Sequence, residues 1–253
     1  MKTAYFLIIT IALIFGTSSL TYSTNFALQL DGKDDHVSCG TKNLPLENTP
    51  RTLEAWFNTT SPDGYQQVVG YGTAGTINSA FALFTKGKEI VITQWGDSVA
   101  IPAGVNDGKW HHGAVTHDGG SKQTIYVDGK VVGNWSKSLN TVVKTCIIGS
   151  CLNENEQFFI GAIDEVRIWS VERTEKEIQD NMNKGLTGKE PDLVSYWNLD
   201  EGDGETVNDL VGNNDGKLMN NPKWIESDAP VMSASVSSFG KLTTKWGEIK
   251  NNS

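Results

Sequence analysis

Short segments in which apolar and polar residues alternate recur along the chain, and Gly, Asn and Asp separate them. Alternation with a period of two is typical of strands that bury one face. The segments are 26–30, 52–58, 67–71, 81–85, 89–94, 110–116, 123–127, 130–135, 145–150, 158–169 and 193–199. Asp128-Gly129, between two of them, is typical of a two-residue hairpin turn. The pattern predicts an all-β fold, a sandwich of two antiparallel sheets.

One short helix is predicted after the longest of these segments. Thr174 and Glu177 have the spacing of a capping box, and Ile178 and Met182 lie on one helical face. Gly185 stands where a left-handed residue would end the helix. We expect the helix to cover one end or edge of the sandwich.

The N-terminus has the features of a secretory signal peptide. Lys2 precedes an apolar run over 4–15, and small residues follow at 16–19. The run is too short to span a bilayer, and no later stretch is longer, so we expect a secreted protein without membrane insertion. The predicted organisation is a signal peptide over 1–24, a domain over 25–225 and a polar tail or linker over 226–253.

The chain is acidic, with 21 Lys and Arg residues against 30 Asp and Glu and a formal net charge of -9. Such a surface repels nucleic acid and anionic lipid, so neither is an expected partner. It suits divalent cations.

The segment Gly161–Trp169 combines a strand pattern with acidic residues. A period of two places Asp164 on the same face as Val166 and Ile168. An ionised carboxylate among apolar residues is costly unless a positive charge meets it. A bound cation would explain it, and so would an ion pair or a position at the strand mouth.

Three cysteines allow at most one disulfide within the chain. Cys146 and Cys151 flank a short Ile-Ile-Gly-Ser segment, and we predict that they pair, although Cys39 could pair with either.

Several motifs resemble the laminin G-like, pentraxin-like jelly roll of the concanavalin A-like lectin/glucanase superfamily. They are Leu-Asp-Gly-Lys-Asp-Asp-His-Val at 30–37, Leu-Glu-Ala-Trp-Phe at 53–57, Asp-Gly-Lys-Trp-His-His at 107–112, Tyr-Val-Asp-Gly-Lys at 126–130 and the segment 161–169. A strand that often opens such domains is found here near the end, at 193–202. It either closes the sheet beside the first strand or begins a second copy, and we expect closure.

The resemblance implies a secreted adhesion or carbohydrate-binding module that uses calcium. Its partner would be a glycan or an extracellular matrix protein. By position, the implied calcium ligands are Asp31, Gly32, Asp34, Asp35 and Asp164. Calcium takes six to eight oxygen ligands, which carboxylates and turn carbonyls supply. The alternative is that Asp31-Gly32 is only a tight turn and that Asp34 and Asp35 are solvated.

Because the superfamily includes glucanases, a pair of suitably spaced carboxylates would indicate a glycoside hydrolase. Glu201, Asp203 and Glu205 have a suitable spacing, but the intervening glycines predict a turn. Adjacent His111 and His112 in a strand point to opposite faces and cannot easily share a metal. No catalytic residue is therefore expected, and a glycoside hydrolase or lyase and a purely structural domain are the alternatives to a binding module.

Tryptophans near strand ends are the predicted ligand contacts. Trp95 precedes Gly96-Asp97, and Trp135 follows Gly133-Asn134, so both could present an aromatic face to a sugar. The predicted ligand-binding residues are Trp95, Asp97 and Trp135, with simple packing as the alternative for each tryptophan.

Overall fold

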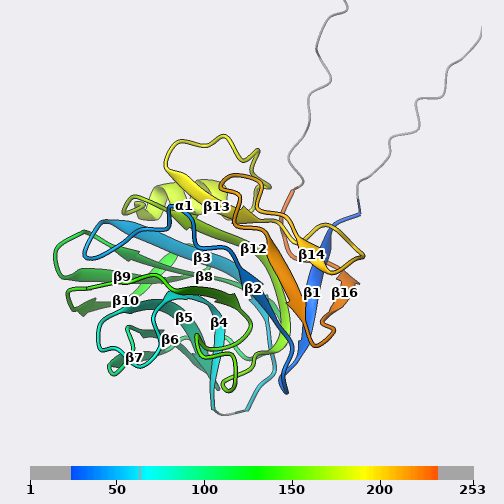
Figure 1. Ribbon diagram of the computed structural model, residues 1–253, viewed down its shortest axis with the longest axis horizontal. Coiled ribbons are helices and arrows are strands. Elements are labelled where there is room, and N and C mark those ends of the chain that lie inside the picture. The colour runs from blue at the N-terminus through cyan, green and yellow to red at the C-terminus, as the bar shows by residue number, and fades with distance from the viewer. Residues whose placement is uncertain (1–23, 63, 233–253) are drawn as a thin grey trace, which may run out of the picture.

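The computed structural model describes residues 24–62 and 64–232, which form two antiparallel sheets packed face to face (Figure 1). The strands of the first sheet are β1 (Phe26–Asp31), β3 (Arg51–Asn58), β8 (Trp110–His117), β9 (Lys122–Val127), β10 (Lys130–Ser136), β12 (Ile160–Trp169), β13 (Leu193–Trp197) and β16 (Lys223–Glu226). Their order is β10-β9-β8-β3-β12-β1-β16, and β13 also pairs with β12.

The second sheet lies against the first. Its strands are β2 (His36–Cys39), β4 (Tyr65–Gly72), β5 (Ala80–Lys86), β6 (Glu89–Thr93), β7 (Ser98–Pro102), β11 (Thr145–Ile148), β14 (Thr206–Val207) and β15 (Gly216–Met219). Their order is β14-β15-β2-β11-β4-β5-β6-β7. The predicted all-β jelly-roll sandwich is confirmed.

The main core fills the space between the two sheets. Its fully buried side chains come from alternate positions of both sheets, and they include Leu28, Leu53, Phe57, Leu83, Ile148, Ile163 and Trp197. Removal of this apolar surface from water is the main favourable contribution to folding, at about 25 cal/mol per Å².

Each segment that was predicted as a strand overlaps an observed strand. The strands that the pattern missed are short or lie at edges: β2, β7, β14, β15 and β16. β7 is the last strand of its sheet, none of its residues is buried, and it ends at Pro102. Such a strand has no buried face, so the alternation that marks a strand is weak there.

A β-bulge in β12 corrects the predicted orientation of Asp164. Glu165 has a φ of 53°, and the register with β3 shifts between Asp164 and Arg167. The extra residue brings Ile163 to the same core-facing side as Val166, so Asp164 lies on the outer face of the first sheet. The prediction that Asp164 shares a face with Val166 was wrong, because a strict period of two does not continue through a bulge.

The predicted helix is α1 (Glu175–Asn181), and the capping box of Thr174 and Glu177 is confirmed. The helix ends at Asn181, with Met182 still right-handed, so the predicted stop at Gly185 was wrong. Tertiary contacts hold the chain beyond α1: the Met182 carbonyl accepts from Trp56 Nε1 at 2.6 Å, and Gly185 N donates to the Met232 carbonyl at 2.8 Å.

The helix covers the outer face of the first sheet. Ile178, its one buried residue, packs there against Ala114 and Tyr126. Within the described residues, no helix has the length and apolar character needed to cross a membrane.

The C-terminal strands complete the same sandwich and do not begin a second one. β13 pairs with the second half of β12, so the predicted position of the 193–202 strand beside the first strand was wrong. The strand that pairs with β1 is β16, at the edge of the sheet. β15 joins the other sheet beside β2. Packing continues beyond the predicted boundary at 225, since the Met232 backbone is bonded to Asn183 and Gly185. The predicted signal peptide, apart from Thr24, and residues 233–253 of the predicted tail lie outside the described residues.

The three cysteine thiols are all free, and the predicted Cys146–Cys151 disulfide is not formed. Cys146 faces the core between the sheets, whereas Cys151 packs on the outer face of the second sheet with Ala82 and Phe84. The residue directly opposite Cys146 in the β2–β11 register is Cys39.

Candidate functional site

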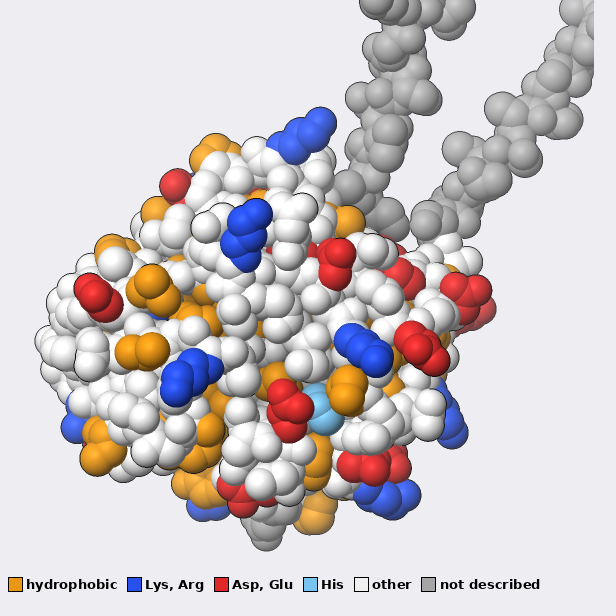
Figure 2. Space-filling model, viewed as in Figure 1, with side chains coloured by type: hydrophobic (Ala, Val, Ile, Leu, Met, Phe, Trp, Pro, Cys, Tyr) orange, Lys and Arg blue, Asp and Glu red, His pale blue; other side chains and the backbone are white. Residues whose placement is uncertain are grey.

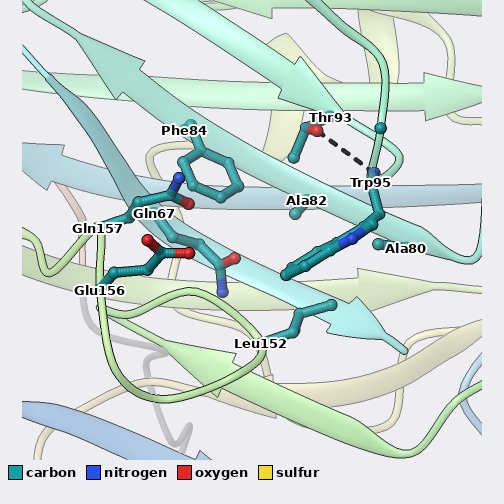
Figure 3. A pocket seen from close by; sticks show the side chains of 10 residues that line it. Gln67, Ala80, Ala82, Phe84, Thr93, Trp95, Leu152, Glu156 and Gln157 are labelled. Atoms are coloured by element: carbon teal, nitrogen blue, oxygen red, sulfur yellow. Dashed lines mark hydrogen bonds between the residues drawn. The ribbon is translucent and has the colours of Figure 1, made fainter. Parts of the chain in front are cut away.

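A pocket lies on the outer face of the second sheet, between the β6–β7 turn and the loop over residues 151–157. Its volume is about 180 Å³, and a neighbouring recess of about 350 Å³ continues it. The residues that line the two are Tyr65, Gln67, Ala80, Ala82, Phe84, Thr93, Trp95, Gly96, Asp97, Ser98, Leu152, Glu156 and Gln157. We call this combined hollow the Trp95 pocket, and Figure 3 shows its first part, around the indole.

Small side chains leave room for the indole of Trp95. Ala80 and Ala82, alternate residues of β5, lie beneath it, and Phe84, two residues further, lies across the pocket (Figure 3). The indole is half-buried and packs against Leu152. One aromatic surface therefore stays partly accessible in a hollow whose floor is apolar.

The backbone at Trp95 adopts a conformation that bulky side chains rarely take. Trp95 and Gly96 have φ values of 68° and 84°, the pattern of a type I′ hairpin turn. Asn and Gly favour such positions, whereas a large residue there is strained. The turn is held by Thr93, whose hydroxyl accepts from Trp95 N at 3.3 Å and donates to the Asp97 carbonyl at 3.1 Å.

Amide and carboxylate groups face the indole across the pocket (Figure 3). Gln67 is buried, and its Nε2 donates to the Ile147 carbonyl at 3.1 Å. Its backbone N donates to the Gln157 carbonyl at 3.0 Å, which joins the 151–157 loop to β4. Glu156 is exposed at the rim. The pocket thus combines an aromatic surface with several polar groups, a composition typical of small-molecule sites.

Two of the three predicted ligand residues lie in this pocket. Trp95 and Asp97 both line it, whereas Trp135 belongs to the edge strand β10 of the other sheet and packs against the main core. Asp97 forms an ion pair with Lys137 at 2.7 Å, and this contact lowers the pKa of its carboxyl.

Four residues of the site were not predicted from the sequence: Gln67, Phe84, Glu156 and Gln157. They come from β4, β5 and the loop after β11, and none lies in a local motif that points to a ligand. The available local signal for these residues was the adjacent polar pair Glu156-Gln157, within the 151–157 loop.

The predicted metal ligands separate into two places. Carboxylate oxygens of Asp31, Asp34 and Asp35 lie within 4.8 Å of one another, around the turn at Gly32. Lys33 Nζ already contacts Asp31 Oδ2 at 3.1 Å. Contact with Lys33 lowers the pKa of Asp31, and burial raises that of Asp35.

Asp164 is distant from this cluster. Asp31 is opposite Ile160, four residues from Asp164, which corresponds to about 13 Å along the strands. Asp164 Oδ2 accepts from Ser227 Oγ at 2.7 Å and from Asn25 Nδ2 at 3.4 Å.

The other carboxylate oxygen of Asp164, Oδ1, differs from Oδ2 in its lack of contacts. Oδ1 is buried and has no hydrogen-bond partner among the described residues. Burial and the neighbouring carboxylate of Glu165 raise the pKa of Asp164 well above its usual value, and Asp200 adds to the effect. Asp200 was not identified from the sequence. The position of Asp200 just after β13 brings it to β1, where it accepts from Phe26 N at 2.9 Å.

The acids considered for hydrolysis do not converge in a cleft. Glu201 Oε1 accepts from the backbone N and side-chain Nδ2 of Asn208 at 2.7 and 2.9 Å. Glu205 is exposed, and its carbonyl accepts from Leu218 N on β15. These contacts are typical of a turn that stabilises the fold.

The adjacent histidines point to opposite faces, as predicted. His112 is buried on the outer face of the first sheet, with Nε2 3.6 Å from Glu54 Oε2. His111 contacts Asp107 and Asp128 through its two ring nitrogens at 3.1 and 2.9 Å. On the face shown in Figure 2, Lys and Arg side chains lie singly and form no basic patch.

Comparisons with known proteins agree with this architecture. A carbohydrate-binding candidate from Bacteroides ovatus ATCC 8483, whose crystal structure is known, superposes with a TM-score of 0.67 at 21% identity. The match covers 83% of this chain and 62% of that protein, so the chain spans less than two thirds of its length. A heptameric SAP-like pentraxin from Limulus polyphemus superposes with a TM-score of 0.50 at 14% identity, over 63% of this chain and 82% of the pentraxin.

No curated protein sequence matches the chain. A family model described as the concanavalin A-like lectin/glucanases superfamily matches residues 31–179, more than half of the chain. That range includes β3, β8 and β12 of the first sheet and β4 to β7 of the second. The chain therefore belongs to the concanavalin A-like lectin/glucanase superfamily.

Proposed function

We propose that this protein is a glycan-binding module without catalytic activity and that a sugar binds in the Trp95 pocket. The observation that carries the proposal is the strained turn, which holds a half-buried indole over the small side chains of Ala80 and Ala82. Strained residues concentrate at ligand sites, and aromatic faces suit the apolar faces of sugar rings. The fold shared with the Bacteroides ovatus protein supports the same class of function.

A single shallow pocket of this kind binds weakly. We expect dissociation constants between millimolar and micromolar, about -4 to -8 kcal/mol. Several copies on one surface would be needed for firm attachment, because linked sites gain effective concentration.

The test is a glycan array probed with multimerised protein, followed by titration of the strongest glycan with the parent and a Trp95→Asn variant. Asn-Gly is favoured in a type I′ turn, so the variant should keep the melting temperature within a few degrees. Loss of the indole should weaken binding by about tenfold or more. Trp135→Phe is the matched control, since Trp135 packs against the core. It should bind like the parent.

Three outcomes would contradict this proposal. Parent-like binding by Trp95→Asn would exclude the Trp95 pocket as the sugar site. Silence of the whole array, together with specific capture of an extracellular matrix protein, would favour protein adhesion. Release of reducing ends from β-glucans, galactans or xylans, abolished by Glu201→Gln, would show that the protein is an enzyme.

We further propose that calcium stabilises the fold at Asp164. The residues fit a hard cation: Asp164 Oδ1 is buried without a partner, and the carboxylates of Glu165 and Asp200 add negative charge. Asp164 would hold the ion through Oδ1, and the carboxylate of Asp200 would add negative charge. The ion would neutralise a charge that is costly to bury.

Thermal melting with calcium and with a chelator tests this calcium proposal. Calcium at one hundred times its dissociation constant should add about 2.7 kcal/mol to stability. Asp164→Asn should abolish the calcium-dependent rise in melting temperature, whereas Asp34→Asn in the other acidic cluster should keep it. The reverse result would place calcium at Asp31, Asp34 and Asp35.

We also propose that the protein is secreted, on the basis of the signal-peptide features of its N-terminal sequence. N-terminal sequencing of the exported protein should show cleavage between residues 19 and 24. A mature protein that retains Met1 would contradict it.

A further inference from the structure

The charge of the Trp95 pocket indicates which sugars it accepts. Among the described residues that line it, Asp97 and Glu156 carry negative charge, and none is Lys or Arg. The other polar groups are neutral: the amides of Gln67 and Gln157 and the hydroxyl of Thr93. A ligand in this pocket would meet carboxylates and neutral groups only.

Two lysines contact residues that line the pocket, and each is already paired with a carboxylate. Lys137 Nζ contacts Asp97 Oδ2 at 2.7 Å, and Lys86 Nζ lies 3.9 Å from Glu89 Oε2 and 5.3 Å from the ring centroid of Tyr65. Recognition of a carboxylate or sulfate usually relies on a guanidinium or ammonium group that the ligand can reach. Neither lysine lines the pocket, so an acidic sugar would lose the hydration of its charge without a matching cation.

Neutral sugars are better matched to the same groups. The exposed carboxylate of Glu156 can accept bonds from sugar hydroxyls, and such charge-assisted bonds are stronger than those between neutral groups. Gln157, beside it, offers both a donor and an acceptor.

We propose that the Trp95 pocket selects neutral sugars and rejects sugars that carry a carboxylate or sulfate. This inference rests on the proposed glycan binding and specifies its substrate class. Selection arises because the exposed carboxylate of Glu156 repels a second anion over a few ångströms, where screening by salt is incomplete, while the charge of Asp97 is offset by Lys137.

The experiment compares sugars that differ by one charge. Immobilised oligosaccharides of glucose, galactose and mannose are each paired with the corresponding uronic-acid oligosaccharide at equal density, and the parent is titrated at low and high salt. In every pair that binds, the neutral member should bind about tenfold more tightly at low salt. The difference should narrow at 0.5 M salt, because the Debye length falls below about 5 Å.

Variants separate the charge effect from the shape of the pocket. Glu156→Gln should reduce the neutral-to-acidic ratio at low salt. Glu172→Gln is the matched control: it removes an exposed acid on the connection between β12 and α1, which lies with the first sheet and lines no part of the Trp95 pocket. This control should leave the ratio unchanged.

The outcomes distinguish this inference from the proposed function. A uronic-acid oligosaccharide bound as tightly as its neutral counterpart, in a Trp95-dependent manner, would overturn the selection and keep glycan binding. An unchanged ratio for Glu156→Gln would overturn the assigned cause. Absence of binding to every neutral and acidic glycan would overturn the proposed function and the selection with it.

Discussion

Two cysteines lie opposite each other on neighbouring strands of the second sheet, and this arrangement determines which thiols can form a disulfide. Cys39 and Cys146 are directly opposed on β2 and β11. Burial raises the pKa of Cys39 well above its usual value, so it reacts slowly as a thiolate. Cys151 is separated from both, because it lies on the outer face of the second sheet.

Oxidation should therefore join Cys39 to Cys146 and leave Cys151 free. A bridge that closes a loop of about 100 residues stabilises by about 4.7 kcal/mol in the chain-entropy model. Non-reducing peptide mapping after refolding in a glutathione redox buffer checks the pairing. Cys151→Ser should keep the rise in melting temperature that oxidation gives the parent, and a Cys146–Cys151 peptide would contradict this assignment.

At the scale of elements, a buried charge network holds α1 and the chain that follows it against the first sheet. Arg167 bonds to the carboxylate of Glu165, and it donates to the carbonyls of Asn181 and Lys184 at 3.1 and 2.7 Å. Tyr196 Oη donates to the same carboxylate at 2.8 Å. The bulge at Glu165 is what places these groups on one face.

Replacement of Arg167 by Met should destabilise the protein by about 3–5 kcal/mol, because Glu165 would be left buried without its cation. The free energy of unfolding in urea measures the effect. Glu165→Gln in the same background should restore part of it. Lys176→Met is the matched control, since it breaks only an exposed pair with Asp180 and should give no measurable change. If Arg167→Met and Lys176→Met lowered the free energy of unfolding by the same amount, the role of the network would be contradicted.

The whole molecule is an acidic sandwich whose stability should depend on the charge state of buried groups. His112 is fully buried next to Trp56, and burial lowers its pKa to about 4. Arg167 lowers it further, whereas Glu54 raises it. The folded protein therefore keeps His112 neutral at a pH where the unfolded chain is already protonated.

The contribution of His112 to stability should fall as the pH decreases from about 6.5 to about 4, whereas the raised pKa values of Asp164 and Asp200 act in the opposite direction. In this range the unfolded state binds a proton that folded His112 does not, and the loss amounts to about 3 kcal/mol. The lowered pKa of His117 acts in the same direction. Urea unfolding at a series of pH values is the measurement, and His112→Gln should flatten the slope. Asp107, with a pKa lowered to about 2, contributes only below this range. An equally steep slope in His112→Gln would exclude His112 as the cause.

Local patterns determined the class of fold and the start of the helix. Alternation over segments such as 52–58 and 123–127 predicts strands because each strand buries one face, and that period is independent of its partners. The capping box at Thr174 involves residues three apart and is equally local. The five motifs between 30 and 169 together suggested the superfamily.

Only the tertiary structure decided which side chains meet. The Trp95 pocket combines β4, β5, the β6–β7 turn and the 151–157 loop, and the register between strands brings them together. The bulge at Glu165 turned Asp164 away from the core, and the β2–β11 register placed Cys39 opposite Cys146. These relations depend on strand pairing and packing between distant segments. Local periodicity indicates which face of a strand is buried, but it does not indicate which residues lie opposite that face.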